Sequence, residues 1–103
     1  MSRIELPAKS PDATQNIVFD FTSMLAAGAT IISAGVTATV YSGTDASPSA
    51  IVNGSSVISS QKVTQSITAG VDGTIYDLEC EVSTSDAQVL QLGAYLAVAR
   101  NLP

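Results

Sequence analysis

The chain has 103 residues and a formal net charge of −5 at pH 7. Hydrophobic residues make up 46% of it. Charged residues make up only 13%, against about 25% in an average soluble protein. This length suits one domain with its own core, and the composition excludes intrinsic disorder, which requires low hydrophobicity and high charge. The low charge suggests that other subunits cover part of the surface.

Basic residues are too few to make nucleic acid an expected partner, because no cluster can neutralise a row of phosphates. The four are Arg3, Lys9, Lys62 and Arg100. The N-terminus lacks the apolar stretch of a signal peptide. The apolar segment 24–41 is interrupted by glycines and threonines, which favours a strand over a membrane span. We therefore expect no nucleic-acid and no membrane partner.

Residues 1–13 are predicted to be an N-terminal arm, and residues 14–103 a single domain. The arm contains two prolines and half of the basic residues, and it has no periodic apolar face. One interpretation is a frayed terminus. The other is an arm that becomes ordered against a neighbouring subunit, in which case Arg3 and Lys9 are candidate partner-binding residues.

The segment 16–21 predicts a first strand, because its apolar residues recur with period two. The inward residues are Ile17, Phe19 and Phe21. Thr22 or Ser23 is suited to cap one short helical turn after this strand, with Gly28 as its end.

The segment 30–43 is rich in β-branched residues and predicts a second strand. Alternation from Gly35 onward places Tyr41 on the face opposite the apolar residues. Tyr41 is therefore the main exposed aromatic residue and a candidate partner-binding residue. Gly35 itself interrupts the alternation, which favours a bulge there.

The middle of the chain predicts a hairpin and a weaker strand. Residues 42–49 are typical of a loop, and Asn53-Gly54 predicts a two-residue type I′ turn, because both residues tolerate positive φ. The segment 62–68 places the polar Gln65 between two apolar residues of one face. We expect a weak strand at a sheet edge.

Two final strands, 75–82 and 88–98, complete about seven short strands. Together with one short helical turn, they predict an all-β fold, an immunoglobulin/fibronectin-like β-sandwich. Tyr76 begins a late strand just after a turn. A tyrosine at this place in such sandwiches donates or accepts a hydrogen bond with nearby backbone.

The stretch "YDLECEVST", residues 76–84, contains the strongest candidates for chemistry. Strand alternation places Cys80 on the inward face and Asp77, Glu79 and Glu81 on the other. The thiol then cannot form a joint site with the carboxylates. Cys80 is typical of a small buried hydrophobe, and a catalytic thiol would need a base that a chain without histidine does not offer.

The three carboxylates have several interpretations. The plainest is a solvated sheet face, and the functional one is a docking stripe for a basic patch on a neighbouring subunit. A calcium site is a weaker alternative, because a straight row of carboxylates does not converge on one ion. No nucleotide-binding, hydrolase or metal-ligand motif occurs in the chain. We therefore expect a non-enzymatic protein without a cofactor.

Three segments carry a resemblance to a known family. They are "KSPDA" (9–13), "FDFTSMLAAGATI" (19–31) and "GTIYDLECEVSTSDAQ" (73–88). In this order they resemble the fibre-tail adaptor group of tailed phages, which are small virion proteins with an immunoglobulin-like module. The resemblance covers most of the chain from Lys9 onward. The chain differs at Phe21, where the family usually has tryptophan.

The resemblance implies an adaptor or decoration subunit at the head, neck or tail-fibre attachment region of a virion. Its partners would be other virion proteins and copies of itself in a symmetric assembly, formed in the host cytoplasm. Two alternatives remain open. One is a carbohydrate- or cell-surface-binding module that uses Tyr41 to stack on sugars. The other is a self-assembling fibre subunit that donates its terminal strand, residues 88–99, to a neighbour.

Overall fold

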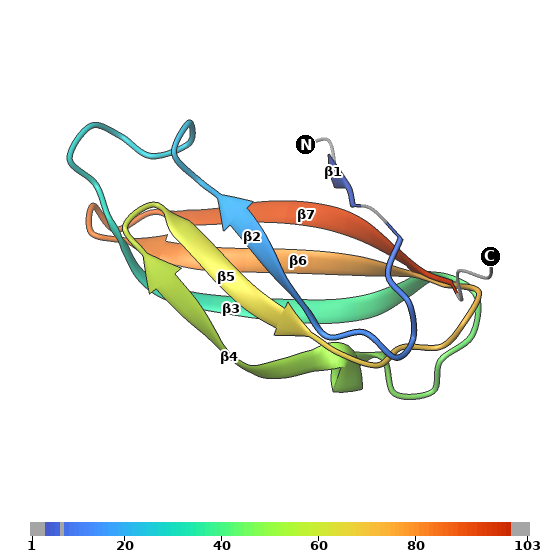
Figure 1. Cartoon of the computed structure of the whole chain (residues 1–103). Helices are drawn as coiled ribbons and strands as arrows, with labels where there is room; N and C mark the ends of the chain where they lie inside the picture. The colour runs from blue at the N-terminus through green and yellow to red at the C-terminus, as the bar shows by residue number, and fades with distance from the viewer. Residues whose placement is uncertain (1–3, 7, 100–103) are drawn as a thin grey trace.

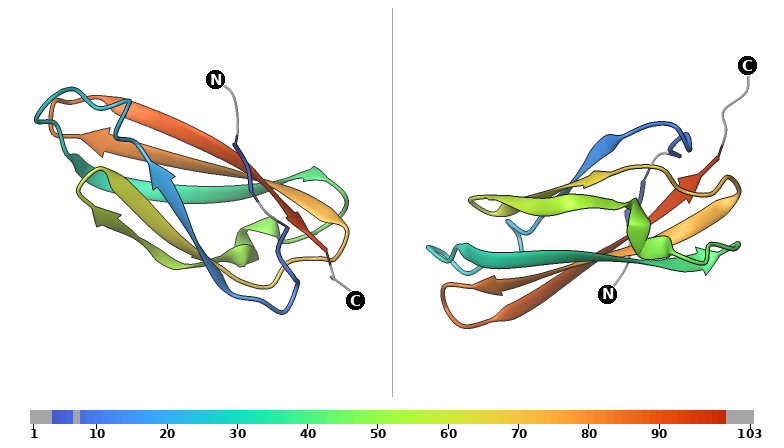
Figure 2. Two further views of the ribbon diagram at one scale, coloured as in Figure 1. Left: turned by 45° about the horizontal axis from the view of Figure 1, so that its top comes forward. Right: turned by 90° about the horizontal axis from the view of Figure 1, so that it is seen from below.

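The structure is a computed structural model, and it describes residues 4–6 and 8–99. Seven strands form two sheets that pack face to face, so the predicted all-β sandwich is confirmed (Figure 1; Figure 2). The four-stranded sheet has the order β1-β7-β6-β3, and the three-stranded sheet the order β2-β5-β4. The strands are β1 (Ile4–Glu5), β2 (Gln15–Asp20), β3 (Ile31–Ser42), β4 (Val52–Ser59), β5 (Lys62–Ile67), β6 (Thr74–Thr84) and β7 (Val89–Val98).

β6 lies inside the larger sheet, and its residues alternate strictly between the two faces. Its even-numbered residues are buried, and its odd-numbered residues from Ile75 to Ser83 lie on the outer face. It pairs antiparallel with β3 on one side and with β7 on the other. The inward residues of both sheets meet in one core. Its members in β2, β5, β6 and β7 include Ile17, Phe19, Val63, Ile67, Tyr76, Leu78, Cys80, Val82, Ala94, Leu96 and Val98.

The bulges of β3 do not lie where the sequence predicted them. Gly35 pairs regularly with Glu81, and the register shifts fall between Ile31 and Ser33 and between Val40 and Ser42. The second shift adds one residue to the strand at Tyr41. A bulge re-aims the side chains beside it. Gly35 therefore does not lie at a bulge of β3, contrary to the prediction.

The prediction that 62–68 forms an edge strand is wrong, because β5 is the central strand of the smaller sheet. Gln65 points inward and is only 1% exposed. Its amide Nε2 donates to the carbonyls of Asn53 and Gly54 at 3.2 and 3.1 Å. A third bond reaches the carbonyl of Ser66 at 3.0 Å. The buried amide is therefore satisfied, which is the condition for burying it.

The hairpin predicted at Asn53-Gly54 is also displaced. Both residues lie inside β4, and the turn to β5 is at Ser60 and Gln61, where Ser60 has φ of 56°. Gly54 does adopt a positive φ of 74°, as the prediction required. It uses this freedom in the irregular stretch between Asn53 and Val57, where the register with β5 shifts.

The described residues contain one helical turn, the 3-10 helix η1 (Pro48–Ile51), and not the turn predicted at 22–27. Proline fixes a helical φ at its start, and the fully buried Ile51 anchors its end. After β2, the amides of Met24 and Leu25 both bond to the Phe21 carbonyl, at 2.9 and 3.1 Å. The chain then turns at Gly28 without forming a helix.

The expected tyrosine bond is present. The Tyr76 hydroxyl accepts a hydrogen bond from the Val71 amide at 2.9 Å and donates one to Asp45 Oδ2 at 2.6 Å. These two bonds connect the start of β6 to the loops that contain Val71 and Asp45. Within residues 4–6 and 8–99, no helix is long and apolar enough to cross a membrane.

Candidate docking surface

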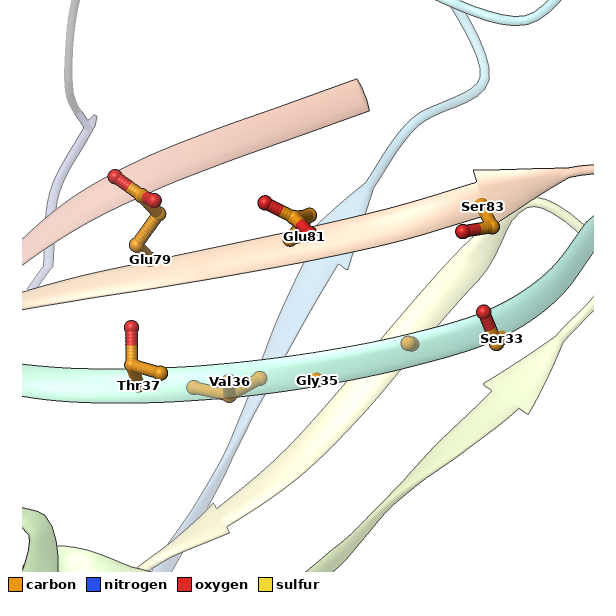
Figure 3. A pocket seen from close by; sticks show the side chains of 8 residues that line it. Ser33, Gly35, Val36, Thr37, Glu79, Glu81 and Ser83 are labelled. Atoms are coloured by element: carbon orange, nitrogen blue, oxygen red, sulfur yellow. The ribbon is translucent and has the colours of Figure 1, made fainter. Parts of the chain in front are cut away.

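The outer face of the four-stranded sheet carries the predicted carboxylate row. Asp77 and Glu79 are half-buried and Glu81 is exposed. Glu79 lies opposite Thr37 of β3, and Figure 3 shows Glu79 and Glu81 on the same side of β6. Because alternate strand residues lie about 7 Å apart, the three charges repel only mildly in water. The row therefore presents negative charge along β6 without a converging ion site.

A hollow of about 340 Å³ lies beside this row, between β3 and β6 (Figure 3). Gly35 stands opposite Glu81 there, and no other atom lies within 4 Å of the place that its side chain would fill. On the other side of β6, Gln91 Nε2 of β7 donates to Glu81 Oε2 at 2.8 Å. The missing side chain at Gly35 thus leaves the Glu81 carboxylate exposed to solvent on the outer face of the sheet.

An aromatic pair lies at one end of the same face. Tyr41 is 61% exposed, and its ring centroid is 4.5 Å from that of Tyr95 in β7. The two rings line a hollow of about 230 Å³. Its other lining residues are Glu5, Leu6, Ile75 and Ala97. An exposed aromatic beside carboxylates is suited to receive a cationic side chain of a partner.

Of the basic residues that the structure describes, neither Lys9 nor Lys62 lies on this face. Lys9 is fully buried, and its Nζ donates to the carbonyls of Ser10 and Ala69 at 2.8 and 2.5 Å. Burial lowers the pKa of Lys9, and the nearby Asp12 opposes that shift. Lys62 belongs to the three-stranded sheet. Arg3 lies outside the described residues.

The structure therefore separates the six predicted partner-binding residues. Four of them gather on one face, namely Tyr41, Asp77, Glu79 and Glu81. Lys9 instead fixes the N-terminal segment to the domain, because its backbone pairs with Val98 and its side chain reaches the turn at Ala69. The burial of Lys9 makes its side chain unavailable to a partner in this conformation.

Sequence reasoning missed Glu5 and Tyr95 as members of this face. Glu5 pairs with Tyr95 when β1 adds in parallel to β7. A two-residue strand has no detectable period, so nothing in the sequence indicated where it pairs. Tyr95 follows the alternation of β7, and its outward position was available from the pattern.

Cys80 has no access to the carboxylates. Its side chain is fully buried in the core, and burial raises the pKa of the thiol to about 12. A thiol with such a pKa stays protonated and unreactive at neutral pH. Among the described residues, no group of three histidine, cysteine, aspartate or glutamate side chains is placed to hold a metal ion.

Comparison with known proteins adds one finding about the family of this chain. No curated protein matches the chain. Residues 9–96 match the family model described as podophage GP4 fiber-tail adaptor protein gp77. The match spans both sheets, from the buried Lys9 to Leu96 of β7. The chain therefore belongs to the podophage GP4 fiber-tail adaptor family.

Proposed function

We propose that the chain is a non-enzymatic adaptor subunit that joins the tail fibre to the phage tail. The family match carries this proposal, because residues 9–96 include all of β2 to β6 and most of β7. An adaptor needs surfaces that bind other virion proteins, and it needs no reactive site. The buried, protonated Cys80 and the absence of a metal cluster among the described residues fit that role.

The acidic sheet face is the proposed docking surface for a neighbouring virion protein. Four carboxylates lie on it or at its rim. They are Glu5, Asp77, Glu79 and Glu81. Complementary charge speeds association and suppresses wrong partners, so the expected partner surface is basic. Tyr41 would supply an aromatic contact of the kind that dominates interface energies.

Repeated copies around the tail axis are part of the same proposal. Phage tails are built from rings of identical subunits, and such rings use heterologous contacts between different surface patches. The two outer faces of this sandwich differ, so they offer the two different patches that a head-to-tail contact joins. The low charge of the whole chain also fits a subunit that is largely covered by neighbours.

The test is to build phage particles with the substitution Glu81→Lys and count tail fibres in electron micrographs. We expect fewer fibres per particle, because a basic partner surface would meet a new positive charge. The matched control is Asp72→Lys, which makes the same charge change in an exposed loop. Normal fibre numbers in both variants would remove the acidic face from the proposal. Particle reconstructions that place the chain away from the fibre-tail junction would remove the adaptor role.

A sugar-binding module is a second candidate, favoured by the exposed ring of Tyr41 against Tyr95. Aromatic rings that stack on sugars are the usual anchors of such sites. Binding of the purified chain to a glycan array, lost in Tyr41→Ala, would support this function. Fibre attachment that is unchanged in Tyr41→Ala would then separate the two functions.

A further inference from the structure

Gly35 lies inside β3, where glycine is a costly residue. A glycine in a strand loses more backbone entropy on folding than other residues do, and it has no side chain to pack. It usually occurs there at a bulge, at a positive φ, where a side chain would clash, or where another molecule approaches the backbone closely. The surroundings of Gly35 decide between these reasons.

The first three reasons do not apply to Gly35. It pairs with Glu81 within a stretch of regular register over residues 33–40, and its φ lies outside the left-handed region. No atom lies within 4 Å of the place of its missing Cβ. Gly43 is the contrast, because its φ is 105° and its Cβ would lie 2.9 Å from the Thr74 Cα. Close approach by another molecule is the usual reason that remains for Gly35.

The hollow over this glycine has only oxygen atoms as its polar side-chain atoms (Figure 3). Ser33 lies opposite Ser83, and Thr37 lies opposite Glu79. Glu81 lies between these two pairs, opposite the glycine. Within the described residues, none of the three hydroxyls makes a hydrogen bond. Carboxylates accept hydrogen bonds and hydroxyls can accept them, so the best match is a group with several donors.

Glu81 gives the hollow its negative charge. It is exposed, and its Oε2 accepts a hydrogen bond from the neutral side-chain amide of Gln91 at 2.8 Å. Within the described residues, no lysine or arginine forms an ion pair with Glu81. The charges of Asp77 and Glu79 are not needed for this argument about Glu81. Because complementary charge favours association, the expected occupant is a cation.

We propose that this hollow is a socket for one arginine side chain of a neighbouring virion protein. The guanidinium group is flat, and it has five N–H donors and no acceptor. It lies over the Gly35 backbone, donates to the Glu81 carboxylate and reaches hydroxyls of the same hollow. Lysine is a poorer match, because its compact ammonium group is not planar and does not bond in a fork. The nature of the partner rests on the adaptor function proposed above, whereas the arginine socket does not.

Arginine binding can be measured on the purified wild-type chain by NMR. The probe is arginine blocked at both ends, Nα-acetyl-arginine methylamide, and its control is the neutral citrulline compound of the same shape. We expect saturable changes in the amide chemical shifts of Gly35 and Glu81 with the arginine probe. The citrulline compound should bind roughly fivefold more weakly, or weaker still. Equal binding of both compounds, or no change at Gly35 with arginine, would overturn the socket.

Filling the hollow tests the reason for the glycine. Gly35→Val should abolish the arginine-induced change at the Glu81 amide, because the new side chain occupies the space over the backbone. Gly35→Ala adds only the Cβ, which meets no atom within 4 Å, so the midpoint of urea unfolding should stay equal or rise. A clear fall of that midpoint in Gly35→Ala would show that the fold itself requires the glycine, and the proposal would be wrong.

The matched control is Thr64→Ile, on the outer face of the three-stranded sheet, where Thr64 is half-exposed. It also adds apolar volume to the outer face of a strand, and it should bind arginine normally. Glu81→Gln removes the charge without adding volume and should weaken arginine binding by roughly fivefold or more. This variant tests the socket even if Gly35→Val does not fold. Unchanged binding in Glu81→Gln would contradict the role of Glu81.

Phage particles separate the socket from the adaptor function. Particles with Gly35→Val should carry fewer fibres in electron micrographs, and particles with Thr64→Ile should carry normal numbers. If Gly35→Val particles keep their fibres while Glu81→Lys particles lose them, the socket is wrong and the acidic docking surface stands. Intact arginine binding in a chain located away from the fibre-tail junction would keep the socket and remove the adaptor role. Concentration-dependent dimers that disappear in Gly35→Val would identify a second copy as the occupant and would overturn the proposed partner.

Discussion

The two outer faces of the sandwich contrast sharply, although the two inner faces share one core. The outer face of the four-stranded sheet carries the row Asp77, Glu79 and Glu81 and no described cation. The outer face of the three-stranded sheet has a central row of Val18, Thr64 and Val57. Its one acidic residue, Asp20, lies opposite Lys62. The inward residues therefore form the shared core, and the outward residues give the two faces their different charge.

The inner faces differ in regularity. β6 alternates regularly and pairs with β7 without a break, and its inward residues are mostly apolar. In the smaller sheet, β4 is irregular near Gly54, and its carbonyls need a donor that β5 supplies through Gln65. The larger sheet is thus held by apolar packing alone at its centre, and the smaller sheet also by a buried polar contact.

The largest expected change in the free energy of unfolding comes from the core of the four-stranded sheet. Leu78→Ala removes a fully buried side chain at the centre of β6 and should lower the free energy of unfolding by about 3 kcal/mol. Val57→Ala, at a position that is 62% exposed on the other sheet, should change it by less than about 0.5 kcal/mol. Urea denaturation followed by circular dichroism measures both. Equal effects would contradict the assignment of inner and outer faces.

The next effect tests the polar contact of the smaller sheet. Gln65→Ala leaves the carbonyls of Asn53 and Gly54 without this donor and should cost about 2 kcal/mol. Thr64→Ala, the half-exposed neighbour, is the control and should cost much less. Hydrogen exchange should also quicken along β4 in Gln65→Ala. A stability equal to that of the wild type would show that the amide is dispensable.

Alkaline pH should lower the free energy of unfolding, because the Cys80 thiol is buried in the core. Burial raises the pKa of its thiol from the usual 9.0 to about 12, so above pH 9 the unfolded thiol ionises while the folded one stays neutral. The free energy of unfolding should therefore fall as the pH rises, by about 2 kcal/mol at about pH 10.5. Denaturation at about pH 8 and about pH 10.5 measures this loss. Cys80→Ala lacks this contribution, and an equal loss in that variant would refute it.

The smallest effect concerns the bond between Tyr76 and Asp45. The hydrogen bond from the Tyr76 hydroxyl and that from the Ser47 amide lower the pKa of Asp45. The stabilisation is present above the usual value of 3.8 and is lost as the pH falls through the lower folded pKa. Tyr76→Phe should cost about 1 kcal/mol at neutral pH and flatten this acid dependence. Tyr41→Phe, on the exposed ring, is the control and should leave both unchanged.

The sequence predicted much of the larger sheet correctly. β6 alternates cleanly, and both its buried residues and its outward carboxylates lie where alternation predicted them. The sequence predicted the smaller sheet less accurately. Gln65 looked like the mark of an edge strand, because sequence alone cannot show that carbonyls of β4 lie within reach of its amide.

Local turn signals were less reliable than alternation. Gly54 has the positive φ expected of it, yet the hairpin forms at Ser60 and Gln61. Positive φ is a local property, whereas the place of a turn depends on the register that buries Val63 and Ile67 of β5. The helical turn lies at Pro48–Ile51 and not where it was predicted for a similar reason, because burial of Ile51 stabilises it there.

The sequence by itself determined the all-β class, the inner and outer faces of β6, and the isolation of Cys80 from the carboxylates, because period two is a property of one strand. Tertiary structure alone decided that Lys9 is buried, that Tyr41 meets Tyr95, and that β1 covers only part of β7. Those features depend on which distant segments pair. Pairing is fixed by the packing of the whole core, to which each short segment contributes only a small share.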